Sequence, residues 1–439
     1  MNKLLIFAFL CLLFFACGEK ETFYLGGIQV HEQDQHEWVR LVKHTGMNTI
    51  EVTAYAMQGD WDSDNVWWKR DEPWVLSEIQ AAKAQGLKVV VVLRTAVDHA
   101  FPHNKFFWHG MIMPENDSLL KEWFRKYEKY VSMWASISEE HGVDVLVIGS
   151  ELNALSATTA TDTMPGLLSY YNNPNKQAKH EKRVLKFRNE LRPEDLYVRG
   201  FDNYQELEQY IDDEIAVKTA WAKKLACTQV EDSLQQMNLR RALLQKLWLD
   251  LIEKTRKQYS GKLGYAANFD NYQEVGFWHA LDFIGINAYF PLREANPALV
   301  EDSLYATLQN GWERVFAEID SFRLRDSLPD MPVIFTELGY LYRKHCTIQP
   351  WAGFGFSVVG KEPDEQLLVW ARQPVDRRER ALAVDALYEV VKKQKQPFQG
   401  ILYWKLTGHD YLVREEPFAL LLDSAATDPL IPALLQFRK

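Results

Sequence analysis

The sequence predicts an α/β fold, a (β/α)8 TIM barrel with a helical insertion after the fourth strand. Strand-like and helix-like segments alternate from Phe23 onward, with regular Gly punctuation. The strand-like segments are short apolar runs, as expected for parallel strands that are buried on both faces. Two of these runs deliver a glutamate, Glu151 or Glu337, at their carboxyl ends. In such a barrel this end of the strands opens into the active site.

Eight strands are expected, at 24–30, 48–54, 88–94, 144–148, 263–268, 283–290, 333–336 and 400–406. Helices are expected at 35–43, 72–85, 117–141, 232–259, 302–326 and 377–394, with a short closing helix at 429–437. Four helices are expected to end at glycines in the left-handed conformation, Gly46, Gly86, Gly142 and Gly261. A doubly wound open sheet is the alternative, but no Gly-rich phosphate loop follows the first strand.

One segment, about 154–231, is longer than a barrel connection needs. Amphipathic patterns predict helices at 179–191 and 204–226 within it. We expect this insertion to lie over the strand-four side of the cleft, where it shapes substrate access, acts as a lid or offers a partner surface. An elaborated scaffold without direct contacts is an equally good interpretation.

The composition fits a large globular enzyme or binding protein. The chain has 439 residues, 47% of them hydrophobic, which is enough for one big barrel or two domains. The formal net charge of -10 argues against a nucleic-acid or anionic-membrane partner. The 15 Trp and 19 Tyr residues are typical of carbohydrate binding, although large cores and protein interfaces also use such rings. The oligomeric state is not determined by these numbers.

Residues 1–17 are expected to be a signal peptide and not part of the 18–439 barrel domain. A short charged start is followed by an apolar run, Leu4 to Ala16, that is too short to span a membrane. Cys17 directly follows this run, as in bacterial lipoprotein signals. We therefore expect export, lipidation of Cys17 and anchoring to a bacterial membrane at its periplasmic or cell-surface face. An ordinary cleaved signal peptide is the alternative.

No cofactor and no metal site are expected. Cys227 and Cys346 remain after the signal, and whether they pair is left open. His99 and His103 have the spacing of a helical ligand pair, but Pro102 argues against the helix that such a pair needs.

Glu151 and Glu337 are the strongest candidates for catalysis. The fourth and seventh strands lie across the barrel from each other, so their carboxylates can flank a bound sugar. Two carboxylates in this arrangement are the minimal equipment for cleaving a glycosidic bond. A glutamate in an apolar strand is costly to bury unpaired, so a salt bridge at the barrel rim is the alternative for each residue taken singly.

Polar and aromatic residues at other strand ends are candidates for substrate binding. The Tyr289 hydroxyl is placed to hydrogen-bond the nucleophile, and Trp404 to form a stacking floor for the sugar. Asn268, Asn287 and Arg94 are suited to contacts with sugar hydroxyls. Ordinary rim packing is the alternative for each of these residues. Further aromatic residues, Trp351 among them, lie in long loops and are interpreted as an extended saccharide groove or as small loop cores.

Four segments of this sequence resemble glycoside hydrolase family 113, and together they cover nearly the whole mature chain except the insertion. They are 148–153 (IGSELN), 265–268 with 274–278 (YAAN and EVGFW), 281–292 (LDFIGINAYFPL) and 335–340 (FTELGY). The resemblance implies a retaining endo-β-1,4-mannanase. It implies that Glu151 is the acid/base and Glu337 the nucleophile, with Tyr289 beside it.

The chain departs from the family pattern at two places. Ser150 stands where the wider clan has an Asn that contacts the sugar 2-hydroxyl, and Ala96 stands where relatives carry a His, although His99 lies close by. The expected function is therefore retaining hydrolysis of a β-linked polysaccharide, most specifically of mannan. Another β-glycan, release of single sugars, and a non-catalytic glycan-binding lipoprotein remain alternatives. The retaining mechanism also leads us to expect that apolar surroundings raise the pKa of Glu151.

Overall fold

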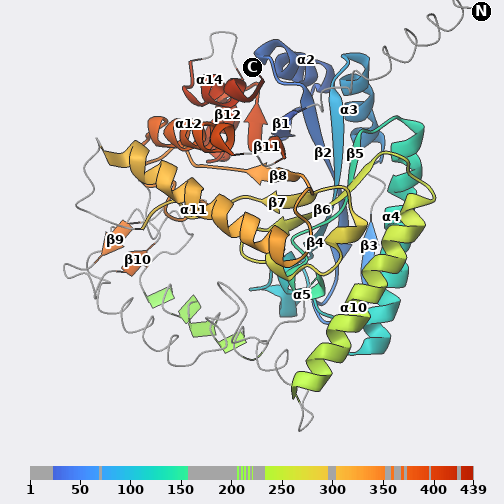
Figure 1. Ribbon diagram of the computed structural model, residues 1–439. Helices are drawn as coiled ribbons and strands as arrows, with labels where there is room; N and C mark the ends of the chain where they lie inside the picture. Colours follow the sequence, from blue (N-terminus) through green and yellow to red (C-terminus); the bar gives the residue numbers. More distant parts are fainter. Residues whose placement is uncertain are drawn as a thin grey trace, which may run out of the picture.

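A closed barrel of parallel strands forms the centre of the molecule (Figure 1). The computed structural model describes residues 23–68, 72–156, 233–294, 303–351, 373–394, 397–422 and 427–438, with short pieces at 205–206, 209–210, 212–213, 216–217, 220, 357–359 and 367–369. The barrel strands are β1 (Tyr24–Gln29), β2 (Thr49–Gln58), β4 (Lys88–Val97), β5 (Val145–Ser150), β6 (Lys262–Asn268), β7 (Ile284–Asn287), β8 (Val333–Leu338) and β11 (Phe398–Thr407). Because β1 pairs in parallel with both β2 and β11, the ring closes, and the barrel prediction is confirmed.

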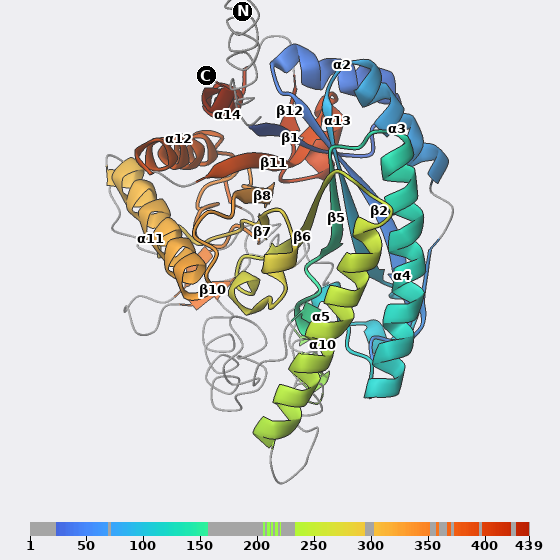
Figure 2. The ribbon, with the colours of Figure 1, turned by 45° about the vertical axis from the view of Figure 1, so that its right-hand side comes forward.

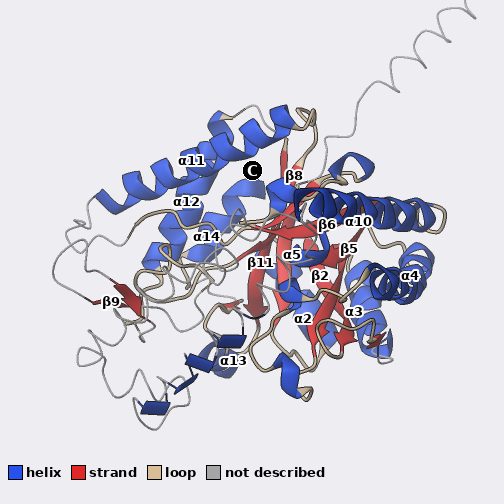
Figure 3. Ribbon diagram, turned by 90° about the horizontal axis from the view of Figure 1, so that it is seen from below, coloured by secondary structure: helices blue, strands red, loops and turns tan. Residues whose placement is uncertain are grey.

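The helices lie around the barrel, as Figure 3 shows in a view from below. They are α2 (Gln35–Thr45), α3 (Glu72–Ala84), α4 (Asp117–Glu140), α5 (Asn153–Ser156), α10 (Ser233–Arg256), α11 (Leu304–Arg325), α12 (Arg378–Lys393), α13 (Asp410–Glu415) and α14 (Leu430–Leu435). The long helices α4 and α10 lie side by side (Figure 2), and α11 packs on α12. Short 3-10 helices stand in the loops: η1 (Pro102–Asn104), η2 (His109–Met111), η4 (Tyr272–Glu274), η5 (Trp278–Ala280) and η8 (Gln436–Arg438).

Side chains along each strand point alternately into the barrel and outward to the helices, and they form one core inside the barrel and another between barrel and helices. On β5, Val145 and Val147 point into the barrel, whereas Leu146 and Ile148 face the helices. A Cβ atom at Gly264 would lie 2.1 Å from the ring of Phe283. Glycine at this position therefore leaves room for that ring inside the barrel. The floor beneath the strand ends is therefore filled and rigid.

The helix ends follow the predicted signals with one exception. Asp34 caps α2 by accepting hydrogen bonds from the backbone amides of the next turn. Gly46, Gly86 and Gly142 have positive φ angles of 95°, 73° and 63°. The prediction for Gly261 is wrong: α10 ends earlier, at Arg256, and the chain turns back through hydrogen bonds to the carbonyl of Thr255.

Four further strands were not expected from the sequence. β2 runs four residues beyond its predicted end and forms an antiparallel hairpin with β3 (Val66–Trp68). β12 (Leu420–Leu421) pairs with β11, and β9 (Ser357–Val359) pairs antiparallel with β10 (Leu367–Val369). β9 and β10 belong to the long connection between β8 and α12.

The predicted signal segment 1–17, Cys17 and Cys227 lie outside the described residues, as does most of the 154–231 insertion. Of the insertion, the described helical pieces include Tyr210, whose ring lies 5.1 Å from that of Phe106 in the loop after β4. Cys346 is a buried free thiol. Within the described ranges, no helix has the length and apolar character needed to cross a membrane.

Candidate active site

Glu337 is turned toward the barrel mouth by an irregularity in its strand. On β8, Phe335 lies opposite Ile286 of β7, but the next matched pair is Glu337 opposite Asn287. The extra residue, Thr336, reverses the alternation of side chains that strict strand geometry imposes. Bulges of this kind often re-aim a side chain next to an active site.

Glu151 follows a second irregularity, on the far side of the barrel. Three residues of β5, ending at Ser150, lie opposite two residues of β6, ending at Ala266. Glu151 then adopts a left-handed conformation with φ of 52°, which is uncommon for a residue other than glycine. Its amide donates to the carbonyl of Ala266 at 2.8 Å, and the next amide, of Leu152, donates to the hydroxyl of Tyr265 at 2.9 Å. These bonds hold a backbone conformation that is typical of functional sites.

The Glu337 carboxylate accepts hydrogen bonds from three side chains, one on β4, one at the end of β7 and one just after β7. Arg94 Nη2 and Asn287 Nδ2 donate to Oε1 at 2.5 Å and 2.8 Å, and the Tyr289 hydroxyl donates to Oε2 at 2.6 Å. Thr336 donates to Oδ1 of Asn287 at 2.9 Å, which fixes the amide with its nitrogen toward Glu337. Both oxygens of Glu337 are thereby oriented by neighbours that are themselves buried.

Arg94 lies within the barrel mouth and joins Glu337 to a deeper carboxyl group, Glu51. Its Nη2 is 3.4 Å from Oε1 of Glu51, and its guanidinium lies 5.0 Å from the ring centre of Trp404. Burial raises the pKa of Glu51 to about 8, although Arg94 acts in the opposite direction. Arg94 was expected to contact sugar hydroxyls, which stays a prediction; in the structure its guanidinium pairs with Glu337.

His109 is in contact with Glu151. It lies in η2, in the loop between β4 and α4, and its Nε2 is 2.9 Å from Oε2 of Glu151. The sequence interpretation overlooked His109 and pointed to His99, whose Nδ1 instead lies 3.0 Å from the carbonyl oxygen of Asn104. A histidine in the loop after the third barrel strand was the available signal, but eleven loop residues separate it from the strand end.

The neighbours of the two glutamates set their pKa values in opposite directions. Burial alone would raise the pKa of Glu151, but the hydrogen bond and positive charge of His109, with smaller contributions from Arg94 and Asn287, outweigh it, and the pKa is lowered. Burial raises the pKa of Glu337, and the charge of Glu151 adds to this effect against the opposing charge of Arg94. The expected rise at Glu151 is therefore wrong, because the sequence does not reveal the His109 contact. Since each charge affects the other group, protonation of Glu151 favours ionisation of Glu337.

Five of the expected substrate-binding residues gather around Glu337: Arg94, Ser150, Asn287, Tyr289 and Trp404. Ser150 is connected to Glu337 through Asn287, whose Nδ2 donates to Ser150 Oγ at 3.3 Å. Asn268 stands next to Asn287 in the β6–β7 register, and its buried Oδ1 has no hydrogen-bond partner among the described residues. Trp351 lies further out, 46% exposed, with its ring stacked 5.2 Å from that of Phe269.

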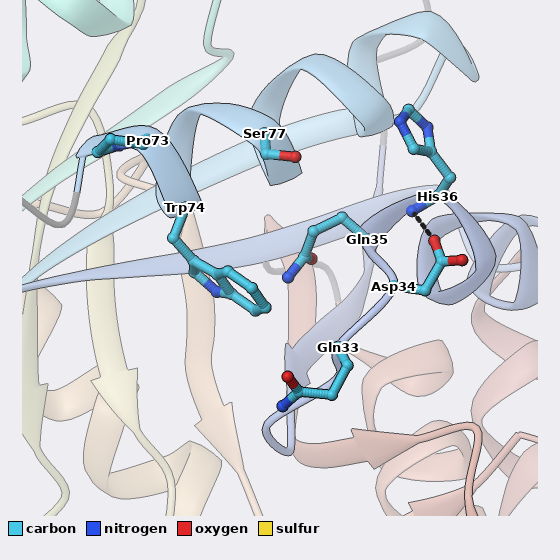
Figure 4. Close-up of a pocket in the computed structure, with 7 residues that line it drawn as sticks. All are labelled: Gln33, Asp34, Gln35, His36, Pro73, Trp74 and Ser77. Carbon is cyan, nitrogen blue, oxygen red and sulfur yellow. Dashed lines mark hydrogen bonds between the residues drawn. The ribbon is translucent and has the colours of Figure 1, made fainter.

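Figure 4 shows a separate surface pocket at the start of α2 and α3, with a volume of about 700 Å³. The pocket is formed around the exposed ring of Trp74 by Gln33, Asp34, Gln35, His36, Pro73, Trp74 and Ser77. None of the residues that surround Glu151 or Glu337 lines this pocket. Among the described residues, no group of three or more His, Cys, Asp or Glu side chains could hold a metal ion.

A (β/α)8 barrel that presents one glutamate directly after β5 and another on β8 has an arrangement that is typical of glycoside hydrolases. The comparisons with known proteins agree. The model of Glycoside Hydrolase Family 113 matches residues 27–163 and 180–379, and the chain belongs to this family. The protein is therefore a glycoside hydrolase that acts on an oligosaccharide or polysaccharide.

Solved structures of the same fold include β-mannanases. A GH113 β-mannanase from Alicyclobacillus acidocaldarius, solved in complex with ManMIm, is 13% identical, with a TM-score of 0.56 and coverage of 95% of this chain and 97% of that one. Two structures described as GH113 β-1,4-mannanase are 15% and 16% identical, with TM-scores of 0.55 and 0.56, and each comparison covers 95% of this chain and 98% of the other. No curated protein matches the chain in sequence.

Proposed function

We propose that this chain is a retaining endo-β-1,4-mannanase in which Glu337 is the nucleophile and Glu151 the general acid and base. The observation that carries the proposal is the difference between the two carboxyl groups. Glu337 is held on both oxygens by three donors, one of them a cation, as a nucleophile must be oriented. Glu151 contacts a titratable side chain, His109, through Oε2, as suits a group that gains and loses a proton.

In the first step, a Glu337 oxygen attacks the anomeric carbon while Glu151 donates its proton to the departing glycosidic oxygen. This gives a glycosyl ester on Glu337 and a carboxylate on Glu151. In the second step, Glu151 takes a proton from water, the water oxygen attacks the anomeric carbon, and Glu337 is released. The retaining mechanism requires carboxyl groups about 5–5.5 Å apart. Product analysis by NMR tests it, because the first-formed sugar must keep the β configuration.

Mannan as substrate is supported by the family and by the β-mannanases that share the fold. Trp404 is proposed as the floor beneath the sugar at the cleavage point, since it lies against Arg94 beside Glu337. Asn268 is proposed to bind a sugar hydroxyl with its unpaired Oδ1, and Trp351 to stack on a sugar further along the groove.

The test is product analysis of the form that lacks residues 1–17, with β-mannans, xylans and β-glucans, alongside Glu337→Gln. Mannooligosaccharides of several lengths from the wild type, and none from Glu337→Gln, are expected. Cleavage of another polymer would keep the mechanism and discard mannan, and release of single sugars would discard endo action. Binding without any hydrolysis would favour a glycan-binding protein that has lost catalysis.

We also propose that the chain is exported and anchored by a lipid on Cys17, as the apolar run before this residue suggests. In a bacterial host, the full chain is expected in the membrane fraction, labelled by a fatty-acid analogue. Cys17→Ala should lose the label. Retention of the label by this variant would contradict the proposal.

A further inference from the structure

The loop between β4 and α4 is built to hold His109 in place. The ring of Trp108 lies against that of His109, with centroids 5.0 Å apart and planes at 77°. A side chain at Gly110 would lie 2.2 Å from the Trp108 ring, so the residue after His109 must be small for this packing. The carbonyls of Trp108 and His109 accept from the amides of Met111 and Ile112. The turn also packs on α5, which begins two residues after Glu151.

The contact with His109 makes the two oxygens of the Glu151 carboxyl group different from each other. The Nε2 atom of His109 is within hydrogen-bond distance, 2.9 Å, of Oε2 of Glu151. The proton that moves to a leaving oxygen must then come from Oε1, and the same atom must later receive a proton from water. Because a hydrogen bond to one oxygen fixes the plane of the carboxyl group, the ring also fixes the direction in which Oε1 points.

We propose that His109 is a positioning residue that orients the Glu151 carboxyl group and sets the pH at which this group holds its proton. The inference rests on the proposed role of Glu151 as acid and base. His109 lies in the loop after β4, whereas Glu151 follows β5 and Glu337 lies on β8.

Several other titratable groups face Glu151, and the proposal has to account for them. They are Arg94 from β4, Glu337 from β8, Asp270 after β6, Tyr265 from β6 and Tyr289 after β7. The hydrogen bond and charge of His109 are the largest influences that lower the pKa of Glu151, ahead of Arg94. A protonated His109 therefore stabilises the Glu151 carboxylate, and a neutral one lets Glu151 keep its proton to higher pH.

Two variants separate orientation from charge. His109→Gln keeps an N–H donor but cannot become a cation, and His109→Ala removes both. The matched control is His103→Ala, because His103 lies in the same loop with 79% of its side chain exposed. Each variant is assayed for kcat/KM, which reports steps up to formation of the glycosyl-enzyme, on a mannooligosaccharide and on an aryl β-mannoside with a good leaving group.

For His109→Gln, the basic limb of the kcat/KM pH profile is expected to move to higher pH. For His109→Ala, kcat/KM is expected to fall about 10²-fold on the oligosaccharide, within the range of general acid catalysis. The fall on the aryl substrate should be much smaller, because a good leaving group needs no proton. A His109→Gln profile that superimposes on the wild type would overturn the role in setting protonation. Equal losses on both substrates in His109→Ala would overturn the role in orientation.

A second measurement does not depend on activity. The titration of the Glu151 carboxyl group, followed by carbon NMR of the glutamate-labelled protein with Glu151→Gln as the assignment reference, should move to higher pH in His109→Gln and stay unchanged in His103→Ala. If the wild type cleaves no glycan, the proposed function fails while this titration still decides the His109 contact. An unmoved titration in an active enzyme would reject the inference alone.

Discussion

Arg94 Nη2 lies 2.5 Å from Oε1 of Glu337, so that a cation from β4 reaches across the barrel mouth to a carboxylate on β8. The same guanidinium contacts Glu51 below and the ring of Trp404 at its side. The planar guanidinium makes both carboxylate contacts through Nη2 while it lies over the Trp404 ring, a combination that the compact ammonium of a lysine does not reproduce.

Arg94→Lys is therefore expected to lower kcat/KM by about 10²-fold, the cost of losing one preorganised electrostatic contact. Arg94 lowers the pKa of Glu337, so a weaker contact lets that pKa rise. Since Glu337 must be ionised to attack, the acidic limb of the kcat/KM profile should move to higher pH. The measurement is this profile, with a thermal melt to establish that the variant is folded. An acidic limb at the wild-type pH would contradict the prediction.

Tyr289→Phe removes the donor to Oε2 of Glu337, which the hydroxyl reaches at 2.6 Å. Burial and the charge of Glu337 raise the pKa of Tyr289 well above its ordinary value, so this hydroxyl keeps its proton and remains a donor. A hydrogen bond to a charged group contributes about 1.5–3 kcal/mol, which corresponds to about a 10–150-fold loss of kcat/KM.

Tyr340→Phe is the matched control for this prediction. Tyr340 is buried just after β8, but its hydroxyl has no hydrogen-bond partner in the ranges that the structure describes. Its removal should leave kcat/KM unchanged. Equal losses in both variants would show that packing of a buried ring, and not the bond to Glu337, explains the effect.

Trp351→Ala is expected to weaken binding of long oligosaccharides without slowing the bond cleavage itself. Trp351 stacks on Phe269 and leaves 46% of its surface exposed. An aromatic stacking contact is worth about 0.5–1.5 kcal/mol, so KM should rise about 2–12-fold while kcat stays near the wild-type value.

Trp74→Ala provides the comparison, because Trp74 is 45% exposed but lies in the separate pocket of Figure 4. This variant should leave the ratio of KM values for long and short oligosaccharides unchanged. Steady-state kinetics on a series of chain lengths makes the comparison, and an unchanged ratio in Trp351→Ala would reject a sugar-binding role.

The fold could be predicted from the sequence because its signals are local. Apolar runs such as 145–148 indicated where the strands lie. Glycines such as Gly46, which has a positive φ, indicated where helices end. Gly261 misled the prediction because a glycine after a helix is compatible with other turns, and here the chain turns before it.

The site could be predicted only in part, because its chemistry depends on contacts between distant segments. The strand positions of Glu151 and Glu337 were evident, but the bulge at Thr336 that turns Glu337 inward has no clear mark in the sequence. Arg94 was recognised as a residue of the strand mouth, yet its partner lies 243 positions away. His109 was missed because the path of a long loop, and not strand periodicity, brings it to Glu151.

Glu51 gives a prediction for stability that is independent of the substrate. Burial raises its pKa from the ordinary value of 4.5 to about 8, and within the described part of the chain its Oε2 has no hydrogen-bond partner. The unfolded chain releases this proton near pH 4.5, whereas the folded chain keeps it to about pH 8. Between these values the folded state binds more protons, so this group makes the protein less stable as the pH rises.

The Gln side chain of Glu51→Gln has no proton to lose and keeps a similar shape. The decline in stability that Glu51 causes as the pH rises should therefore disappear in this variant. Relative to the wild type, the variant is expected to be little changed at pH 5 and more stable at pH 8.5 by about 1–3 kcal/mol, the range for burying an unsatisfied polar group. Thermal melts at the two pH values measure the difference, and other titrating groups cancel in the comparison. Glu37→Gln is the control, because Glu37 is exposed on α2 and paired with Arg40, so its replacement should not produce a gain at high pH. If Glu51→Gln lost stability equally at both pH values, the charge of Glu51 would be a favourable partner for Arg94, and the assignment of a largely protonated Glu51 would be wrong.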